Sequence, residues 1–96
     1  MQNDRFEWDD DKALINLAKH KLSFEIGCKV FDDDLSVEMD DEQVHDYEDR
    51  WLRVGMVEGR LIAVAYTLRG DIIRVISVRG ATPREKRRYH EVEDEE

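Results

Sequence analysis

Six of the 18 residues from Ile72 to Tyr89 carry a positive side chain, in a 96-residue chain with a formal net charge of −9. They are Arg74, Arg79, Arg84, Lys86, Arg87 and Arg88. Positive charge concentrated against the sign of the whole chain indicates a binding site, and its natural ligands are phosphates or a strongly acidic protein surface. Arginine would bind phosphate through two parallel N–H donors, and lysine would act as a point charge.

Alternating apolar residues predict the strands that carry this charge. Three antiparallel strands are expected at Tyr47–Val57, Arg60–Leu68 and Ile72–Arg79. On the third strand, alternation places Ser77 and Arg79 on one face of the sheet and Arg74 on the other. In that position Arg74 could pair with a carboxylate instead of a ligand.

Helices are expected in both halves of the chain. Thr82 is the predicted cap of the last helix, with Pro83 at its first position and Glu85 three residues after the cap, and the helix runs to about Val92. The earlier elements are a strand at Arg5–Trp8, a helix capped by Asp9, a helix capped by Ser23 that ends by Val30 or Phe31, and a strand at Leu35–Met39. This order predicts an α+β fold over a single domain, residues 1–96, with helices on the apolar face of one sheet.

The composition narrows the class of protein. Residues 1–50 have a net charge of −10 and residues 51–90 a net charge of +6. The acidic residues form either a solvated surface or a docking face for a basic partner. The longest uncharged run, Leu61–Leu68, is far shorter than the ~20 residues that span a bilayer, and no signal peptide is visible, so a cytoplasmic location without membrane contact is expected. Cys28 is the only cysteine, which excludes an internal disulfide.

An ordered set of short motifs runs along nearly the whole chain. It comprises Phe6–Asp9; Lys12, Asn16 and Lys19-His20; Ser23–Glu25; Val30–Asp32; His45, Glu48, Arg50 and Gly55; Thr67-x-Arg69-Gly70-Asp71; Ile72-x-Arg74-x-Ile76-Ser77-x-Arg79-x-Ala81-Thr82; and Glu85-x-x-x-Tyr89. In this order and spacing the set resembles the BrnT family of ribonuclease toxins, whose fold is like that of the RelE-type toxins. The chain departs from the family pattern at Lys21, where glycine is usual, and at Gly80, where a basic residue is common. It also has Lys86 where the family has arginine.

The resemblance implies a cytoplasmic endoribonuclease toxin of a type II toxin–antitoxin pair that inhibits translation. Its implied partners are an RNA substrate and a BrnA-like antitoxin, a ribbon-helix-helix DNA-binding protein, so operator DNA would be contacted only through the antitoxin. Toxins of this type need no metal or cofactor. The 2′-hydroxyl attacks the adjacent phosphorus, and the product is a 2′,3′-cyclic phosphate.

This reaction needs groups that stabilise charge on the phosphate and groups that move two protons. The expected catalytic residues are Arg50, Arg79 and Lys86 for charge, and His20 and His45 for proton transfer. The expected substrate-binding residues are Arg53, Arg74, Arg87, Ser77, Tyr89 and Trp51. Several alternatives stay open: a helix-end role for His20, a surface role for His45, and packing for Tyr89 and Trp51.

Two other functions are compatible with the sequence. One is a non-catalytic protein that binds the antitoxin and acts as co-repressor, and the other is an acidic module that binds a basic protein. Growth arrest on expression, rescued by the product of a neighbouring reading frame, would distinguish the nuclease from both. A nuclease also requires the cations of the strands and of the last helix to converge on a pocket sized for one phosphodiester.

Overall fold

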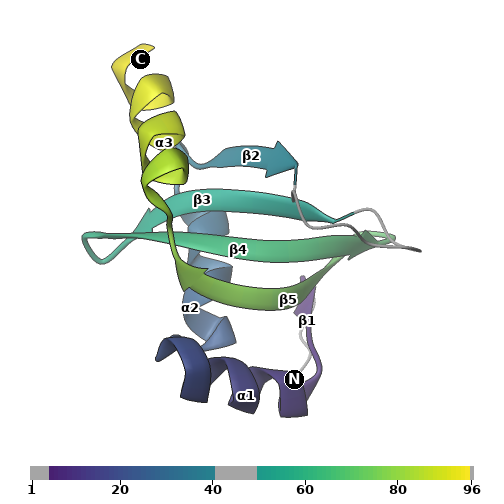
Figure 1. The fold of residues 1–96 in the computed structure, drawn as a ribbon. Coiled ribbons are helices and arrows are strands. Elements are labelled where there is room, and N and C mark those ends of the chain that lie inside the picture. The colour runs from purple at the N-terminus through teal and green to yellow at the C-terminus, as the bar shows by residue number, and fades with distance from the viewer. Residues whose placement is uncertain (1–4, 41–49, 96) are drawn as a thin grey trace.

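A computed structural model describes residues 5–40 and 50–95, which form one five-stranded sheet with helices packed on it (Figure 1). The elements are β1 (Phe6–Glu7), α1 (Asp10–His20), α2 (Phe24–Lys29), a 3₁₀ helix η1 (Val30–Asp32), β2 (Val37–Asp40), β3 (Trp51–Val57), β4 (Arg60–Arg69), β5 (Ile72–Gly80) and α3 (Pro83–Glu95). The strand order is β1-β5-β4-β3-β2, with β1 parallel to β5 and the other pairs antiparallel. The predicted α+β fold is confirmed, and the predicted start of β3 at Tyr47 lies outside the described residues.

The helices begin at the predicted capping residues. The Asp9 carboxylate accepts the backbone N–H groups of Asp11 at 2.9 Å and Lys12 at 3.2 Å, and the Ser23 hydroxyl accepts that of Ile26 at 3.2 Å. These contacts satisfy donors that the first turn of a helix leaves without partners. None of the described helices is both long enough and apolar enough to cross a bilayer.

The end of α1 explains one departure from the family pattern. Lys21 follows the helix with φ of 62°, in the left-handed region, and its backbone N–H donates to the Leu17 carbonyl at 2.9 Å. Glycine adopts this conformation without the steric cost that a Cβ atom imposes. The backbone therefore keeps the geometry for which glycine is usual, although the residue is lysine.

Apolar side chains cover both faces of the sheet, whereas the sequence predicted helices on one face only. The face that packs on α1 and α2, here called the α1 face, has the buried core residues Phe24, Val64 and Val78. The opposite face, here called the α3 face, packs on α3 through Tyr89 and holds Leu52, Val54 and Ala63. The one-face prediction was wrong because every residue of β4 from Leu61 to Thr67 is buried, as in a strand covered on both sides.

A bulge in β5 changes which side chains share a face. The register between β4 and β5 shifts, and Ile76 is left as the extra residue of β5. Because the shift moves the alternation by one residue, Arg74 lies on the α3 face together with Ser77 and Arg79. The prediction of opposite faces was therefore wrong. The anticipated carboxylate partner is present, however, since Nη1 of Arg74 donates to Oε2 of Glu7 at 2.6 Å.

Asn16 completes the edge of β5 where the two-residue strand β1 does not reach. Its Nδ2 donates to the carbonyls of Val78 and Leu22, both at 2.9 Å, and its Oδ1 accepts the Val78 N–H at 3.0 Å. The side chain thus pairs with both backbone groups of Val78 as a neighbouring strand would. Asn16 is 6% exposed, so these bonds are shielded from water.

Asp33 joins α3 to the rest of the fold. Its Oδ2 accepts the Tyr89 hydroxyl at 2.8 Å and the Met56 N–H at 2.8 Å, and its Oδ1 accepts the Leu35 N–H at 2.9 Å. Burial by itself raises the pKa of Asp33, but the hydrogen bonds from Met56, Leu35 and Tyr89 outweigh burial and lower the pKa. The carboxylate is therefore favoured in the folded state.

We expect this contact to make the protein sensitive to acid. A carboxyl group whose pKa is lowered by folding contributes stability above its unfolded pKa, near 3.8, and that contribution is lost as pH falls through the folded pKa. Thermal unfolding followed by circular dichroism should show a steep loss of stability below about pH 4, because a protonated Asp33 no longer attracts its donors as an anion. Asp33→Asn should flatten this slope, whereas Asp34→Asn at the exposed neighbour should keep it. Equal slopes for both variants would contradict the role of Asp33.

Candidate functional site

Most of the predicted strand cations lie on the α3 face. Arg74, Ser77 and Arg79 project from β5, and alternation from Leu52 places Arg50, the residue before β3, on the same face. The Nε atom of Arg50 is buried and has no hydrogen-bond partner within residues 5–40 and 50–95. The bulge in β5 thus places Arg74 on the same face as Ser77 and Arg79, whereas simple alternation along β5 would have put it on the opposite face.

Trp51 and Arg53 lie on the opposite, α1 face. Trp51 is half-buried against the core, which is the packing role that the sequence left open. The Arg53 guanidinium lies 5.5 Å from the centre of the Phe31 ring, and its nitrogens are 3.0 Å from the Ser36 hydroxyl and 3.6 Å from a Glu38 oxygen. These two residues are separated by the sheet from the cations of the α3 face.

The remaining predicted residues occupy different parts of the molecule. His20 is half-buried in the last turn of α1, at the end where a cation is favourable to the helix dipole. Tyr89 is 3% exposed and donates to Asp33, so it packs α3 on the sheet. Arg87 is exposed on α3, and His45 lies outside the described residues.

Arg79 is held by a carboxylate. Its Nη1 and Nη2 donate to the two carboxylate oxygens of Glu85 at 2.7 and 2.9 Å, and Nη1 also donates to the Gly80 carbonyl at 3.2 Å. Glu85 accepts the Thr82 N–H at 2.9 Å while its own N–H donates to the Thr82 hydroxyl at 3.2 Å, which confirms the predicted helix cap. Burial raises the pKa of Glu85, but the bonds from Arg79 and Thr82 outweigh it and lower the pKa. Arg79 therefore fixes the first turn of α3 at the end of β5.

Replacing Arg79 by alanine should destabilise the protein. The Glu85 side chain, 10% exposed, would lose its charged partner, and about 1–3 kcal/mol of unfolding free energy would be lost. Glu85→Gln in the same chain removes the unpaired charge and should restore part of this loss. Urea unfolding of the two single variants and the double variant measures the coupling. If the losses of unfolding free energy in the two single variants add up to the loss in the double variant, the Arg79–Glu85 pair contributes nothing. Arg87→Ala serves as the control at an exposed residue.

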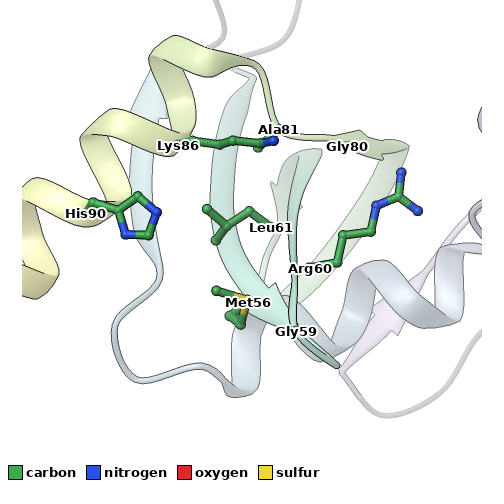
Figure 2. Close-up of a pocket in the computed structure, with 8 residues that line it drawn as sticks. All are labelled: Met56, Gly59, Arg60, Leu61, Gly80, Ala81, Lys86 and His90. Carbon is green, nitrogen blue, oxygen red and sulfur yellow. The ribbon is translucent and has the colours of Figure 1, made fainter.

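A pocket of about 420 Å³ lies where α3, the β3–β4 hairpin and the end of β5 meet. Its described lining residues are Met56, Gly59, Arg60, Leu61, Gly80, Ala81, Lys86 and His90. Lys86 and His90 are four residues apart, on one side of α3, and both extend from the helix toward the pocket in Figure 2. The pocket lining therefore includes a lysine, an arginine and a histidine side chain.

Arg60 lines this pocket from the hairpin, but its side chain extends away from Lys86 and His90, and its guanidinium lies beside Gly80 (Figure 2). A Cβ atom at position 80 would stand 3.3 Å from Nη2 of Arg60, so glycine leaves room for the guanidinium. Position 80 is where the resemblance led us to expect a basic residue. Arg60 places positive charge at that point from a neighbouring strand.

The predicted convergence of strand and helix cations is found only in part. Arg74 and Arg79 share a face, but each is paired with a carboxylate, and the pocket contains Lys86 with two residues that sequence analysis did not select, Arg60 and His90. The spacing of Lys86 and His90 on one helix was a usable signal. No signal in the sequence placed Arg60 at the same pocket. Within the described ranges, no three His, Cys, Asp or Glu side chains lie so that they could hold a metal ion.

Comparison with known proteins identifies one family. The family model described as "Ribonuclease toxin, BrnT, of type II toxin-antitoxin system" matches residues 8–85. That span runs from Trp8 to Glu85, so it includes Arg79 and Arg60 and ends just before Lys86. A search of the curated proteins found no match.

Proposed function

The chain belongs to the BrnT family of ribonuclease toxins of type II toxin–antitoxin systems, and from this premise we propose that it cleaves RNA at the pocket between α3 and the β3–β4 hairpin. One observation carries the choice of site: Lys86, Arg60 and His90 line a single pocket of about 420 Å³ in a chain of net charge −9. Cationic side chains hold a phosphodiester, and an imidazole in the same pocket can act as a general base.

In the proposed reaction the 2′-oxygen attacks phosphorus while the bond from phosphorus to the 5′-oxygen breaks. His90 accepts the proton of the 2′-hydroxyl, and the leaving 5′-oxygen takes a proton from water. The proton on His90 then neutralises the hydroxide that remains, which regenerates the imidazole. Lys86 stabilises the negative charge that develops on the non-bridging oxygens, where a fixed cation is most effective, and Arg60 binds a flanking phosphate. The products are a 2′,3′-cyclic phosphate and a 5′-hydroxyl, and no metal takes part.

The α3 face extends the site along the RNA. Arg50, Arg74 and Ser77 can contact phosphates and ribose that flank the cleaved bond, and Arg87 can do so from α3. Arg79 is assigned a positioning role, because both of its terminal nitrogens bind Glu85 and thereby hold the helix that carries Lys86. Flanking contacts of this kind orient the substrate, and the pocket provides the chemistry.

One observation favours a second function. The pairing of Arg74 with Glu7 and of Arg79 with Glu85 reduces the charge available to RNA on the α3 face. A chain with this surface could bind its antitoxin and act as co-repressor without cleaving RNA. Measurement of RNA cleavage separates the two functions.

The test uses purified protein and a labelled RNA in buffer with excess EDTA. We expect cleavage in EDTA, fragments that end in a 2′,3′-cyclic phosphate, and no cleavage of the same sequence made with 2′-deoxyribose, because the attacking hydroxyl is then absent. Fragments with 5′-phosphate ends, or cleavage that EDTA abolishes, would contradict the mechanism. Intact RNA under all conditions would favour the co-repressor.

The proposed cellular role is tested by expression in bacteria. The protein should act in the cytoplasm, stop translation and arrest growth, and a BrnA-like antitoxin of the ribbon-helix-helix class should neutralise it. The complex should bind operator DNA through the antitoxin alone. Induction of the chain alone and with the product of its neighbouring reading frame, followed by RNA integrity and protein synthesis, checks this. Growth arrest that coexpression fails to relieve would contradict the assigned partner.

A further inference from the structure

The side of α1 that turns away from the sheet exposes large apolar side chains. Leu14 and Ile15 are each 66% exposed, and Leu17 is 44% exposed. Asp10, Leu14 and Leu17 follow the spacing of one helical stripe. Three neighbouring aliphatic side chains left in water on one short helix are typical of a surface that a partner covers.

This stripe borders a groove of about 400 Å³ between α1 and the start of α2. Its described lining residues are Trp8, Asp10, Ala13, Leu14, Leu17, Ser23, Phe24 and Glu25. Trp8 and Phe24 are buried and meet edge to face at 5.8 Å, which gives the groove a rigid aromatic wall. The groove is therefore already formed in the unbound chain.

The charge around the groove is acidic. Asp10 and Glu25 belong to its lining, and Asp9 and Asp11 lie beside Asp10 at the start of α1. Phosphates would be repelled here, so the groove does not suit RNA. The complementary ligand is a peptide segment with large apolar side chains flanked by lysine or arginine.

We propose that the groove binds an amphipathic, basic segment of the antitoxin, with its apolar side chains against Trp8 and Leu17 and its cations against Asp10 and Glu25. The inference rests on the proposed function in one respect, because it takes the protein partner of a type II toxin as the occupant. The groove borders α1 whereas the Lys86 pocket borders α3, on the other face of the sheet (Figure 1). The segment thus anchors the antitoxin, and a different part of it must block the pocket.

The experiment measures the affinity of the full chain for the purified product of the neighbouring reading frame by calorimetry. The double variant Leu14→Gln, Leu17→Gln keeps good helix formers at exposed positions, and its affinity should be about 100-fold weaker. The variant Asp10→Asn, Glu25→Gln should bind about 10-fold more weakly at low salt and with a smaller salt dependence. Lys29→Gln, at an exposed residue outside the groove, should bind as the wild type does.

Unchanged affinity of the leucine variant, with its fold verified by thermal unfolding, would overturn the proposal. A second outcome would also overturn it. If light scattering shows that the wild type is a dimer, and the leucine variant is a monomer that still binds the antitoxin, then a second copy of the chain occupies the groove. RNA cleavage by the free variants keeps the two proposals apart. If the groove variants cleave RNA at the wild-type rate but bind the antitoxin weakly, both the proposed nuclease function and the proposed groove are supported. Absence of cleavage in every chain, with antitoxin binding lost only in the groove variants, would refute the nuclease and leave the groove supported.

Discussion

Replacing Lys86 by alanine is expected to slow RNA cleavage by about a hundredfold to a thousandfold, the usual cost of losing one donor fixed where charge develops. Lys86 lines the pocket and extends toward it from α3. Its side chain is exposed, and no hydrogen bond or ion pair from it to another described residue is found. The substitution therefore removes charge from the site without leaving a buried group unpaired. The rate is measured on labelled RNA at saturating and at low substrate concentration.

The matched control is Lys29→Ala, which changes the net charge equally at an exposed residue of α2. It should cleave RNA at the wild-type rate. Lys86→Arg should retain much of the activity, because arginine keeps the positive charge and also binds phosphate. Equal activity of Lys86→Ala and Lys29→Ala would show that Lys86 contributes only long-range charge and does not act in the pocket.

The largest effect on stability is expected for Asn16→Asp, which should lower the free energy of unfolding by about 3–5 kcal/mol. The carboxylate would lose both donated hydrogen bonds and would face the carbonyls of Val78 and Leu22 at a site that is 6% exposed. A loss of this size is a large part of the roughly 5–15 kcal/mol that stabilises a small domain. Urea unfolding at pH 7 measures it.

Two comparisons make this result specific. Ala18→Asp adds the same charge at an exposed position of the same helix and should cost about 1 kcal/mol or less. Mild acid should restore part of the stability of the Asn16 variant, because the buried carboxyl is more easily tolerated when protonated. A loss below 1 kcal/mol at position 16 would mean that β5 does not depend on Asn16 for its edge.

Local signals in the sequence predicted most of the fold. The cap formed by Thr82 and Glu85 and the caps at Asp9 and Ser23 involve residues within four positions of each other, so they are visible without tertiary structure. The alternation of apolar residues that predicted the strands is also a local signal, and β4 and β5 begin at the predicted residues. The helix α3 continues to Glu95, beyond the predicted end near Val92.

Features that depend on distant residues were not predictable in this way. The bulge at Ile76 arises from pairing with β4, and it moved Arg74 to the α3 face. Asn16 contacts Val78, 62 residues away, so its motif position gave no indication of its bonds. Arg60 and His90 line the same pocket only because the hairpin and α3 are packed together. Candidate cations could thus be selected from the sequence, whereas their partners and their convergence required the fold.

The most direct test of the account is an NMR titration of the ¹⁵N-labelled protein with a short oligonucleotide that carries 2′-deoxyribose at the cleaved position and so binds without reacting. We predict that the amide shifts concentrate at Gly59, Gly80 and Ala81 and along α3 near Lys86, with smaller changes on the α3 face of β5. Shifts confined to α1 and α2, or no shifts at concentrations where RNA is cleaved, would contradict the assignment of the pocket as the site of RNA cleavage.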